Sequence, residues 1–381
     1  MATILLTGVT GTVGSSLAPL LIERGHKLVC LIRGGNPVAR LERAVGRADG
    51  ITVLNGDVTL LNLGLSEREA RVWKRKIDKV VNCAASIQLD GGEPEATLKV
   101  NVTGVKNLLG FAKDLSIPEF HQVSTAYVAG DADYFSEDDF DTGQNSRNFY
   151  EKTKREAEQL LLRWRYGKFS IYRLGIVVGD YQTGYTQAFN GYYVFASSLW
   201  SLRNSLAVKP KEEMAQYLRE GVGFDLDGLL VLPIYLNFAY SSTLNIVPVD
   251  WAAETMAGLV SLDAEDKVFH VVHPRPKKAR WVNNISLRRL GVKGFYYGDY
   301  ADYSSRSNLS RLQKVFDRRT QQYLPYITHE CRFEVANALY ALKERYKPPP
   351  EIDEMFLFTI LDYAKSVDFG RQKPEPKAVM A

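Results

Sequence analysis

A glycine-rich segment near the start of the chain constrains the fold more than any other feature. It follows a short apolar run that ends at Leu6, reads Thr7-Gly8-Val9-Thr10-Gly11-Thr12-Val13-Gly14, and precedes an apolar helical pattern that ends near Gly25. Glycines at this spacing allow a tight turn, a close approach of backbone to a pyrophosphate, and close packing of helix on strand. The phosphates then lie at the helix N-terminus, where free N–H groups and the dipole favour an anion. Rather than a simple glycine-rich turn, we therefore expect a dinucleotide site with contacts from Thr7, Gly8, Gly11, Thr12, Val13 and Gly14.

Short apolar runs recur through the first half of the chain, with helical patterns between them. The runs are Ile4–Leu6, Lys27–Ile32, Ile51–Leu54, Lys79–Asn82, Phe120–Ser124 and Ser170–Arg173. They lack polar alternation, as is typical of strands that are covered on both faces. Strands of this kind alternating with helices predict an α/β fold with a doubly wound parallel Rossmann sheet.

The alternation breaks near Gly179, which suggests a change of domain. Beyond it the sequence indicates an aromatic-rich stretch (181–200), a charged helix (209–220), a short strand (245–250) that leads into a helix (251–262), and a last amphipathic helix (352–367). We expect residues 1–180 to form a nucleotide-binding domain with the catalytic residues. Residues 181–370 are expected to form a smaller, mainly helical substrate domain that can exchange a strand or helix with the first, and residues 371–381 a flexible tail.

Charge and cysteine content exclude several classes of protein. The net charge of +4 arises from mixed signs along the chain, whereas a dedicated nucleic-acid binder clusters its positive charge. Cys30, Cys83 and Cys331 lie far apart, which fits a reducing compartment and argues against a cysteine-based zinc site, so we expect no metal. The N-terminus lacks a signal-peptide pattern and the longest apolar stretch, 226–240, is too short to span a bilayer. We therefore expect a cytoplasmic protein without an integral membrane segment.

The end of the second strand indicates which cofactor is bound. It reads Leu31-Ile32-Arg33-Gly34-Gly35, with Arg40 and Arg43 following. NAD-binding proteins usually place an acid here for the ribose 2′-hydroxyl, whereas an arginine accommodates the 2′-phosphate of NADP. NADPH is therefore favoured over NADH, although Arg33 as an ordinary solvated loop residue stays open. Further contacts with the cofactor are expected from Arg33, Arg40, Asp57, Val58, Ala84 and Ala85.

Tyr150 is the only tyrosine with a lysine four residues on, at Lys154. The surrounding residues have helical spacing, so both side chains are expected on one helix face, one turn apart. An ammonium beside a phenol favours the phenolate and lowers a pKa that is normally about 10. Such a phenol can exchange a proton with a reacting carbonyl oxygen. A helix-surface pair without chemistry is the alternative for this motif taken by itself.

A hydroxyl pair, Ser124 and Thr125, ends the fifth predicted strand. Carboxyl ends of the strands in such a sheet face the ligand crevice. Either hydroxyl can therefore donate a hydrogen bond where negative charge develops on a substrate oxygen. A simple cap at the end of the strand is the alternative interpretation.

Together these residues resemble the extended short-chain dehydrogenase/reductases. The matching motifs are T-G-x-x-G-x-x-G at 7–14, G-D at 56–57, N-C-A-A at 82–85, N-V-T-G at 101–104, V-S-T-A-Y at 123–127, Y-x-x-x-K at 150–154 and Y-R-L-G-I-V-V-G-D at 172–180. The resemblance covers the first 180 residues and implies a catalytic unit of Thr125, with Ser124 as neighbour, Tyr150 and Lys154. It also implies that Lys154 holds the nicotinamide ribose and that Asn101 supports a water chain behind it.

Within that superfamily the second half is most similar to the fatty acyl-CoA reductase and thioester reductase branch. Segments 179–184, 244–251 and 331–337 carry this similarity. The resemblance implies that NADPH reduces an acyl thioester to an aldehyde, with Tyr150 as proton donor, and that the aldehyde can be reduced again to an alcohol. Since no adenylation or carrier domain is attached, the thioester is expected on CoA or on a separate carrier protein.

Alternatives remain open for the substrate half. A dehydrogenase or epimerase of the extended family that acts on a free hydroxyl or ketone (a sterol, flavonoid or nucleotide sugar) shares every motif of the first half. A regulator without turnover would commonly lack the tyrosine or the lysine, and both are present. Residues of 185–200 and 224–240 are candidates for an acyl groove or for ordinary core. The basic segment 273–278 is a candidate for contact with CoA phosphates or an acidic carrier, or a solvated loop.

Overall fold

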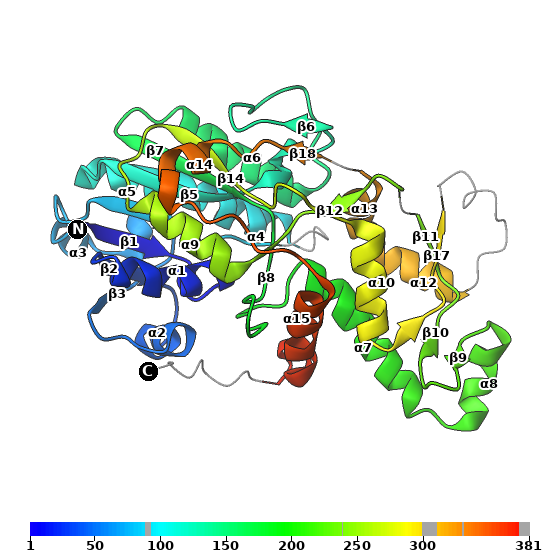
Figure 1. Cartoon of the computed structure of the whole chain (residues 1–381). Helices are drawn as coiled ribbons and strands as arrows, with labels where there is room; N and C mark the ends of the chain where they lie inside the picture. The colour runs from blue at the N-terminus through cyan, green and yellow to red at the C-terminus, as the bar shows by residue number, and fades with distance from the viewer. Residues whose placement is uncertain (88–92, 238, 299–310, 330, 373–381) are drawn as a thin grey trace.

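The computed structural model describes residues 1–87, 93–237, 239–298, 311–329 and 331–372 (Figure 1). Of the predicted tail, residues 373–381 lie outside this range.

A seven-stranded parallel sheet forms the centre of the first half, with the strand order β14-β7-β5-β4-β1-β2-β3. Its strands are β1 (Thr3–Thr7), β2 (Lys27–Ile32), β3 (Ile51–Asn55), β4 (Lys79–Asn82), β5 (Glu119–Thr125), β7 (Lys168–Leu174) and β14 (Lys267–Val271). The first six coincide with the predicted apolar runs, and every residue of β2 after Lys27 is buried. The predicted Rossmann sheet is confirmed. Strand order reverses between β1 and β4, so the crevice for a ligand opens at their carboxyl ends.

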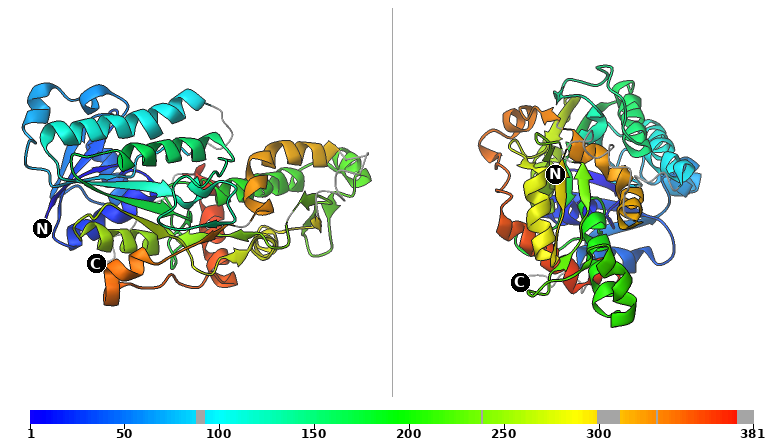
Figure 2. Two further views of the ribbon diagram at one scale, coloured as in Figure 1. Left: turned by 90° about the horizontal axis from the view of Figure 1, so that it is seen from above. Right: turned by 90° about the vertical axis from the view of Figure 1, so that its right-hand side faces the viewer.

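Helices cover both faces of this sheet (Figure 2). On one face α1 (Thr12–Glu23) packs against α9 (Val249–Val260), and on the other lie α5 (Gly104–Leu115) and α6 (Phe149–Leu162). In α5 the buried residues Val105, Leu108 and Ala112 recur at helical spacing, which explains why this stripe faces the sheet. The remaining helices of this half are α2 (Pro37–Val45), α3 (Glu67–Arg71), α4 (Pro94–Leu98) with a π-helical turn at Lys99–Thr103, and α14 (Asn337–Leu342).

Most of the chain beyond residue 180, here called the second half, projects to one side of the sheet around a separate apolar core (Figure 1). Its helices are α7 (Tyr192–Ala207), α8 (Lys211–Arg219), α10 (Ala279–Arg289), α12 (Arg311–Thr320), α13 (Leu324–Thr328) and α15 (Glu354–Ser366). Within the described residues, no helix is both long and apolar enough to cross a membrane.

Short strands pair with one another within the second half, and others join it to the part of the chain that forms the sheet. They are β8 (Ile176–Val178) with β13 (Ile246–Pro248), β6 (Tyr134–Phe135) with β18 (Arg332–Phe333), β12 (Thr243–Leu244) with β15 (Lys277–Lys278), β11 (Tyr235–Asn237) with β17 (Tyr296–Gly298), and β10 (Leu230–Val231) between β9 (Gly223–Phe224) and β16 (Val292–Lys293). Strand β14 and helix α9 come from beyond residue 180, so the chain returns to the sheet after it has left it.

Candidate active site

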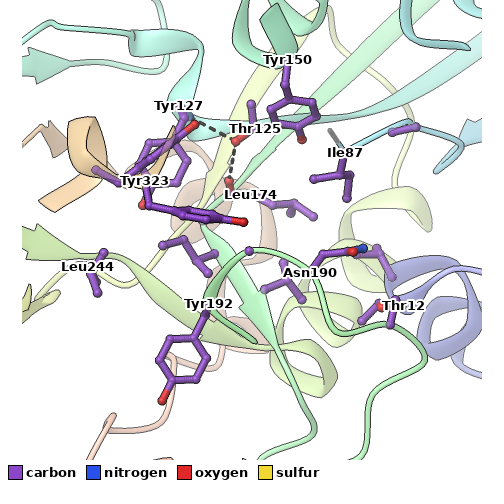
Figure 3. A pocket seen from close by; sticks show the side chains of 18 of the residues that line it. Thr12, Ile87, Thr125, Tyr127, Tyr150, Leu174, Asn190, Tyr192, Leu244 and Tyr323 are labelled. Atoms are coloured by element: carbon purple, nitrogen blue, oxygen red, sulfur yellow. Dashed lines mark hydrogen bonds between the residues drawn. The ribbon is translucent and has the colours of Figure 1, made fainter. Parts of the chain in front are cut away.

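A cavity of about 500 Å³ lies where the carboxyl edge of the sheet meets the second half of the chain (Figure 3). Thr12 of the glycine-rich loop and Leu244 of β12 lie at opposite sides of it, and Thr125 and Tyr150 lie along its wall. One cavity thus joins the predicted cofactor loop to a chamber that the second half encloses.

The glycine-rich loop has the geometry that a dinucleotide requires. Gly8 has φ +69°, and a Cβ there would lie 2.5 Å from the backbone nitrogen of Ala84. A Cβ on Gly14 would lie 2.3 Å from the carbonyl oxygen of Gly8. Gly8, Gly11, Thr12, Val13 and Gly14 all line the cavity where α1 begins. Backbone rather than side chain therefore forms this wall, and it fits a nicotinamide dinucleotide whose phosphates approach the start of α1.

Thr7 lies behind this loop rather than in the cavity. Its hydroxyl is buried and donates to the Asn82 side-chain oxygen at 2.5 Å, and Asn82 donates to Gln122 at 2.9 Å. The same Asn82 oxygen accepts from the N–H of Ala84 at 3.2 Å. This network fixes the adjacent ends of β1, β4 and β5, so Thr7 shapes the loop from below, while Ala85 lines the cavity itself.

Four residues expected to contact the cofactor lie near the carboxyl ends of β2 and β3, outside the cavity lining: Arg33, Arg40, Asp57 and Val58. The guanidinium of Arg40 donates to the carbonyl oxygen of Arg33, whose own side chain is 66% exposed and 3.9 Å from Asp57. The Asp57 carboxylate accepts from the N–H of Thr59 at 2.9 Å, and Val58 is buried beneath. The guanidiniums of Arg33 and Arg40 therefore both lie close to the end of β2.

Thr125, Tyr150 and Lys154 are brought together on the cavity wall. Asn148 caps the N-terminus of α6: its side-chain oxygen accepts from the Glu151 N–H at 2.9 Å, and Tyr150 lies in the first turn. The Lys154 ammonium lies 6.0 Å from the centre of the Tyr150 ring and donates to the carbonyl oxygen of Val123 at 3.0 Å.

Thr125 is the last residue of β5 and points toward the same space. Its hydroxyl donates to the carbonyl oxygen of Leu174 at 3.4 Å and accepts from the N–H of Tyr127 at 3.3 Å (Figure 3). Both bonds are long, so the hydroxyl can turn toward a substrate oxygen at little cost.

Burial dominates the electrostatics of the tyrosine and the lysine. It raises the pKa of Tyr150 above its usual value, Glu151 raises it further, and a hydrogen bond with Thr125 lowers it. Burial lowers the pKa of Lys154 to about 8. The sequence-based expectation of a lowered pKa for Tyr150 is thus wrong, because burial of the phenol raises it. Tyr150 is a neutral phenol at physiological pH, which is the form that donates a proton.

The side chains of Ser124 and Asn101 are both held by protein partners, although Ser124 lines the cavity and Asn101 does not. The Ser124 hydroxyl donates to Glu158 at 2.5 Å, and Glu158 forms a fully buried ion pair with Arg173 at 2.8 Å. Asn101, in the π-helical turn, donates to the carbonyl oxygen of Ser86 and to the Thr153 hydroxyl, both at 3.0 Å. The structure therefore commits both side chains to protein partners, and of the two strand-end hydroxyls only that of Thr125 is free of a carboxylate.

The chamber beyond Thr125 is built by segments that are far apart in the sequence. Seven residues come from the ranges 185–200 and 224–240 that were candidates for an acyl groove: Ala188, Asn190, Gly191, Tyr192, Phe195, Ala196 and Leu236. Sequence reasoning assigned no role to other residues of the chamber, among them Tyr127, Leu244, Val282, Asn283, Ser286, Thr320, Tyr323, Tyr326 and Ile327. Tyr127 and Leu244 lie in segments that carry the family resemblance, whereas the other seven lie in no motif.

The basic segment 273–278 does not line this cavity. Lys277 pairs with Glu351 at 2.6 Å, and Lys278 donates to the carbonyl oxygen of Ser241 at 2.7 Å. His273 is buried and its N–H donates to Asn245 at 2.7 Å. These contacts favour a structural role for the three side chains named.

Comparison with known proteins identifies the family. The model of the family described as male sterility protein matches residues 6–256, a range that holds the glycine-rich loop, Thr125, Tyr150 and Lys154. The chain belongs to this family. The predicted resemblance to the extended short-chain dehydrogenase/reductases and their thioester reductase-like branch is confirmed.

Individual relatives agree with this assignment. The chain is 27% identical over 316 residues to the glycine betaine reductase of Emericella nidulans, an alignment that covers 76% of the chain but only 22% of that protein. Among solved structures, it is similar to the terminal R domain of the myxalamid PKS-NRPS pathway (TM-score 0.72, 22% identity, 98% of this chain and 93% of that one). It is equally similar to a thiolation-reductase di-domain of an archaeal non-ribosomal peptide synthetase (TM-score 0.72, 18% identity, 97% and 76%). The family member thus spans about a fifth of its curated relative and shares the fold of both structures.

Proposed function

We propose that the protein is an NADPH-dependent reductase of acyl thioesters, which it converts to aldehydes with Tyr150 as proton donor. A second reduction to the alcohol is open to the same site, because the hydroxyl, tyrosine and lysine do not distinguish the two carbonyls. The observation that carries the proposal is the single cavity that runs from the glycine-rich loop, past Thr125 and Tyr150, into the chamber of the second half.

The bound cofactor supplies the hydride. Thr125 and Tyr150 donate hydrogen bonds to the carbonyl oxygen as negative charge develops on it, and Tyr150 then gives it a proton. The tetrahedral thiohemiacetal formed in this way breaks its C–S bond, the thiol leaves, and an aldehyde remains. Because burial keeps Tyr150 protonated, no prior proton transfer is needed before reduction begins.

Lys154 stabilises the phenolate that Tyr150 leaves behind and holds the nicotinamide ribose. Its pKa of about 8 leaves it mainly charged at neutral pH, when this role requires a cation. Ser124 and Asn101 act through neighbouring residues. Ser124 fixes the end of β5 through Glu158, and Asn101 fixes α6 through Thr153.

Preference for NADPH rests on Arg33 and Arg40 at the carboxyl end of β2. Arg40 is held against the Arg33 backbone, and the Arg33 side chain is largely exposed. Guanidiniums bind a phosphate in a planar, two-bonded manner, whereas a free ribose hydroxyl gives them little to bind.

The thioester arrives on CoA or on a carrier protein. The likeness to a terminal R domain and to a thiolation-reductase di-domain supports a substrate that is presented by a carrier. Of the described residues that line the cavity, Lys154 is the only one with a full charge. An uncharged, largely apolar acyl group therefore suits the chamber better than the diphosphate of a nucleotide sugar.

The alternative is a dehydrogenase that acts on a free hydroxyl or ketone of an apolar molecule such as a sterol. The catalytic geometry is the same, so a panel of substrates separates the two. Purified protein is incubated with NADPH and a long-chain acyl-CoA, the same acyl group on a carrier protein, or a set of ketones, and products are identified by mass spectrometry. We expect aldehyde or alcohol from the thioesters, whereas NADPH consumption with ketones alone would establish the alternative.

Tyr150→Phe is the matched variant for the catalytic assignment. It retains the ring and removes only the hydroxyl, so it should bind NADPH normally and lose turnover. Undiminished activity would contradict the role of Tyr150.

A further inference from the structure

A buried ionic cluster surrounds the start of the helix that carries Tyr150. Arg147 and Glu151 pair one turn apart, with their side chains 9% and 0% exposed and a shortest distance of 2.8 Å. The guanidinium contacts both carboxylate oxygens, and the Arg147 N–H donates to one of them at 2.8 Å. Burying such a pair is costly, so its presence beside a cavity calls for a role beyond stability.

The cluster reaches across to α13, which forms part of the chamber wall. The Tyr326 hydroxyl donates to Glu151 at 2.8 Å and accepts from the side-chain N–H of Asn148 at 2.7 Å. Asn148 is also the cap of α6, so a single amide joins the start of that helix to Tyr326. Arg147 adds a longer bond, 3.4 Å, to the carbonyl oxygen of Pro325.

The same arginine lies over two rings of the cavity wall. Its guanidinium carbon is 4.4 Å from the centre of the Tyr326 ring and 5.2 Å from that of Tyr127. The two rings meet edge to face with centres 5.0 Å apart. Tyr127 in turn donates its N–H to the hydroxyl of Thr125. Three elements that approach the substrate, the end of β5, the start of α6 and α13, therefore converge on Arg147.

We propose that Glu151, held by Arg147 and Tyr326, is a positioning residue that sets Tyr150 relative to the chamber wall. This inference rests on the proposed function, in which Tyr150 donates the proton. Glu151 does not face the substrate: it fixes the first turn of α6 to α13. The distance from phenol to bound carbonyl then depends on a contact made by the second half of the chain.

Matched variants separate this role from a simple structural brace. Tyr326→Phe keeps the ring in the wall and removes the bond to Glu151, and Glu151→Gln keeps the size of the side chain and removes its charge. Glu213→Gln in α8 is the control, because Glu213 forms a pair of the same spacing with Lys209 at 2.7 Å on an exposed surface. Each protein is assayed for kcat, KM, NADPH affinity, melting temperature and the solvent deuterium isotope effect on kcat.

We expect kcat to fall about 10- to 100-fold in Glu151→Gln and about 10-fold in Tyr326→Phe, because a misplaced proton donor slows the step that it serves. The solvent isotope effect should rise in both, since proton transfer becomes more rate-limiting, while NADPH affinity stays within about twofold. The Glu213→Gln control should match the wild type in every readout.

A fall in melting temperature with an unchanged kcat and isotope effect would overturn the proposal, since a brace alone has that signature. If Glu151→Gln does not fold, Tyr326→Phe decides by the same criteria. Tyr150→Phe separates this inference from the proposed function. If that variant is inactive while both cluster variants behave as wild type, the cluster has no positioning role and the proposed function stands. If Tyr150→Phe is fully active, both fail.

Discussion

The two ends of the cavity are built from different materials. At the cofactor end the wall includes three glycines of the loop, and a Cβ at Gly8 or Gly14 would overlap neighbouring backbone. At the substrate end the wall consists of large side chains from α7, β11, β12, α10 and α13, including several tyrosines. The sequence of the cofactor end therefore tolerates few substitutions, whereas substitutions at the substrate end can change the shape of the chamber.

Because of this difference, we expect single substitutions at the two ends to have different effects on activity. Changes at the cofactor end should affect every substrate equally. Changes at the chamber should affect some substrates and spare others.

The largest effect is expected from Gly8→Ala. Its Cβ would overlap the backbone of Ala84, and φ +69° strains any L-residue, so the loop must move away from the phosphates. We expect NADPH affinity to fall at least about 100-fold, measured by titration calorimetry, with loss of turnover on all substrates. Gly110→Ala in α5 is the control, because its Cβ meets no atom within 4 Å. Normal cofactor binding by Gly8→Ala would contradict the claim that the cofactor end tolerates little change.

Replacing Lys154 is expected to lower activity somewhat less than Gly8→Ala does. Lys154→Met removes the charge that stabilises the phenolate, and we expect kcat/KM to fall about 100- to 10,000-fold. In the wild type, burial disfavours the ammonium and lowers its pKa to about 8, so activity should be lost as the pH rises through that value. Lys154→Arg keeps the charge and should move the alkaline limb to higher pH. A wild-type profile that is flat from about pH 7 to pH 10 would contradict this assignment of Lys154.

The arginines after β2 should affect one cofactor and not the other. Arg33→Ala should weaken NADPH about 10- to 100-fold, the value of a charged hydrogen bond to phosphate, and leave NADH affinity nearly unchanged. Arg43→Ala, an exposed position on α2, is the matched control. Equal losses for both cofactors would show that Arg33 does not read the ribose phosphate.

The smallest effect is expected at the far side of the chamber. Leu244→Trp fills space at that side of the cavity, so kcat/KM should fall about tenfold for the longest acyl chains accepted and little for short ones. Leu218→Trp, on the exposed face of α8, controls for the added bulk. A uniform loss across chain lengths would mean that Leu244 supports the fold rather than the choice of substrate.

The sequence was sufficient for the fold and for the cofactor loop because both depend on local patterns. Apolar runs without alternation gave six of the seven strands in the sheet, and glycine spacing gave the loop. The pairing of Tyr150 with Lys154 also follows from helical spacing, and both line the cavity.

Tertiary context decided what local patterns could not. The pKa of Tyr150 follows burial, which spacing along a helix does not report. Ser124 and Thr125 are neighbours in sequence, yet only the fold reveals that Glu158 takes up the first hydroxyl. Tyr326 lies 175 positions from Glu151, and no motif links them. The chamber could not be predicted from the sequence for the same reason, because its wall is formed by segments that are far apart in the chain.

The most direct test follows the hydride itself. NADPH with deuterium at the transferable position of the nicotinamide is supplied to the wild type with a long-chain acyl thioester, and the product is analysed by mass spectrometry. We expect an aldehyde, or the alcohol derived from it, that carries deuterium at the former carbonyl carbon, and no such product from Tyr150→Phe. Recovery of the intact thioester, with no deuterium in any product of the wild type, would contradict the proposed function.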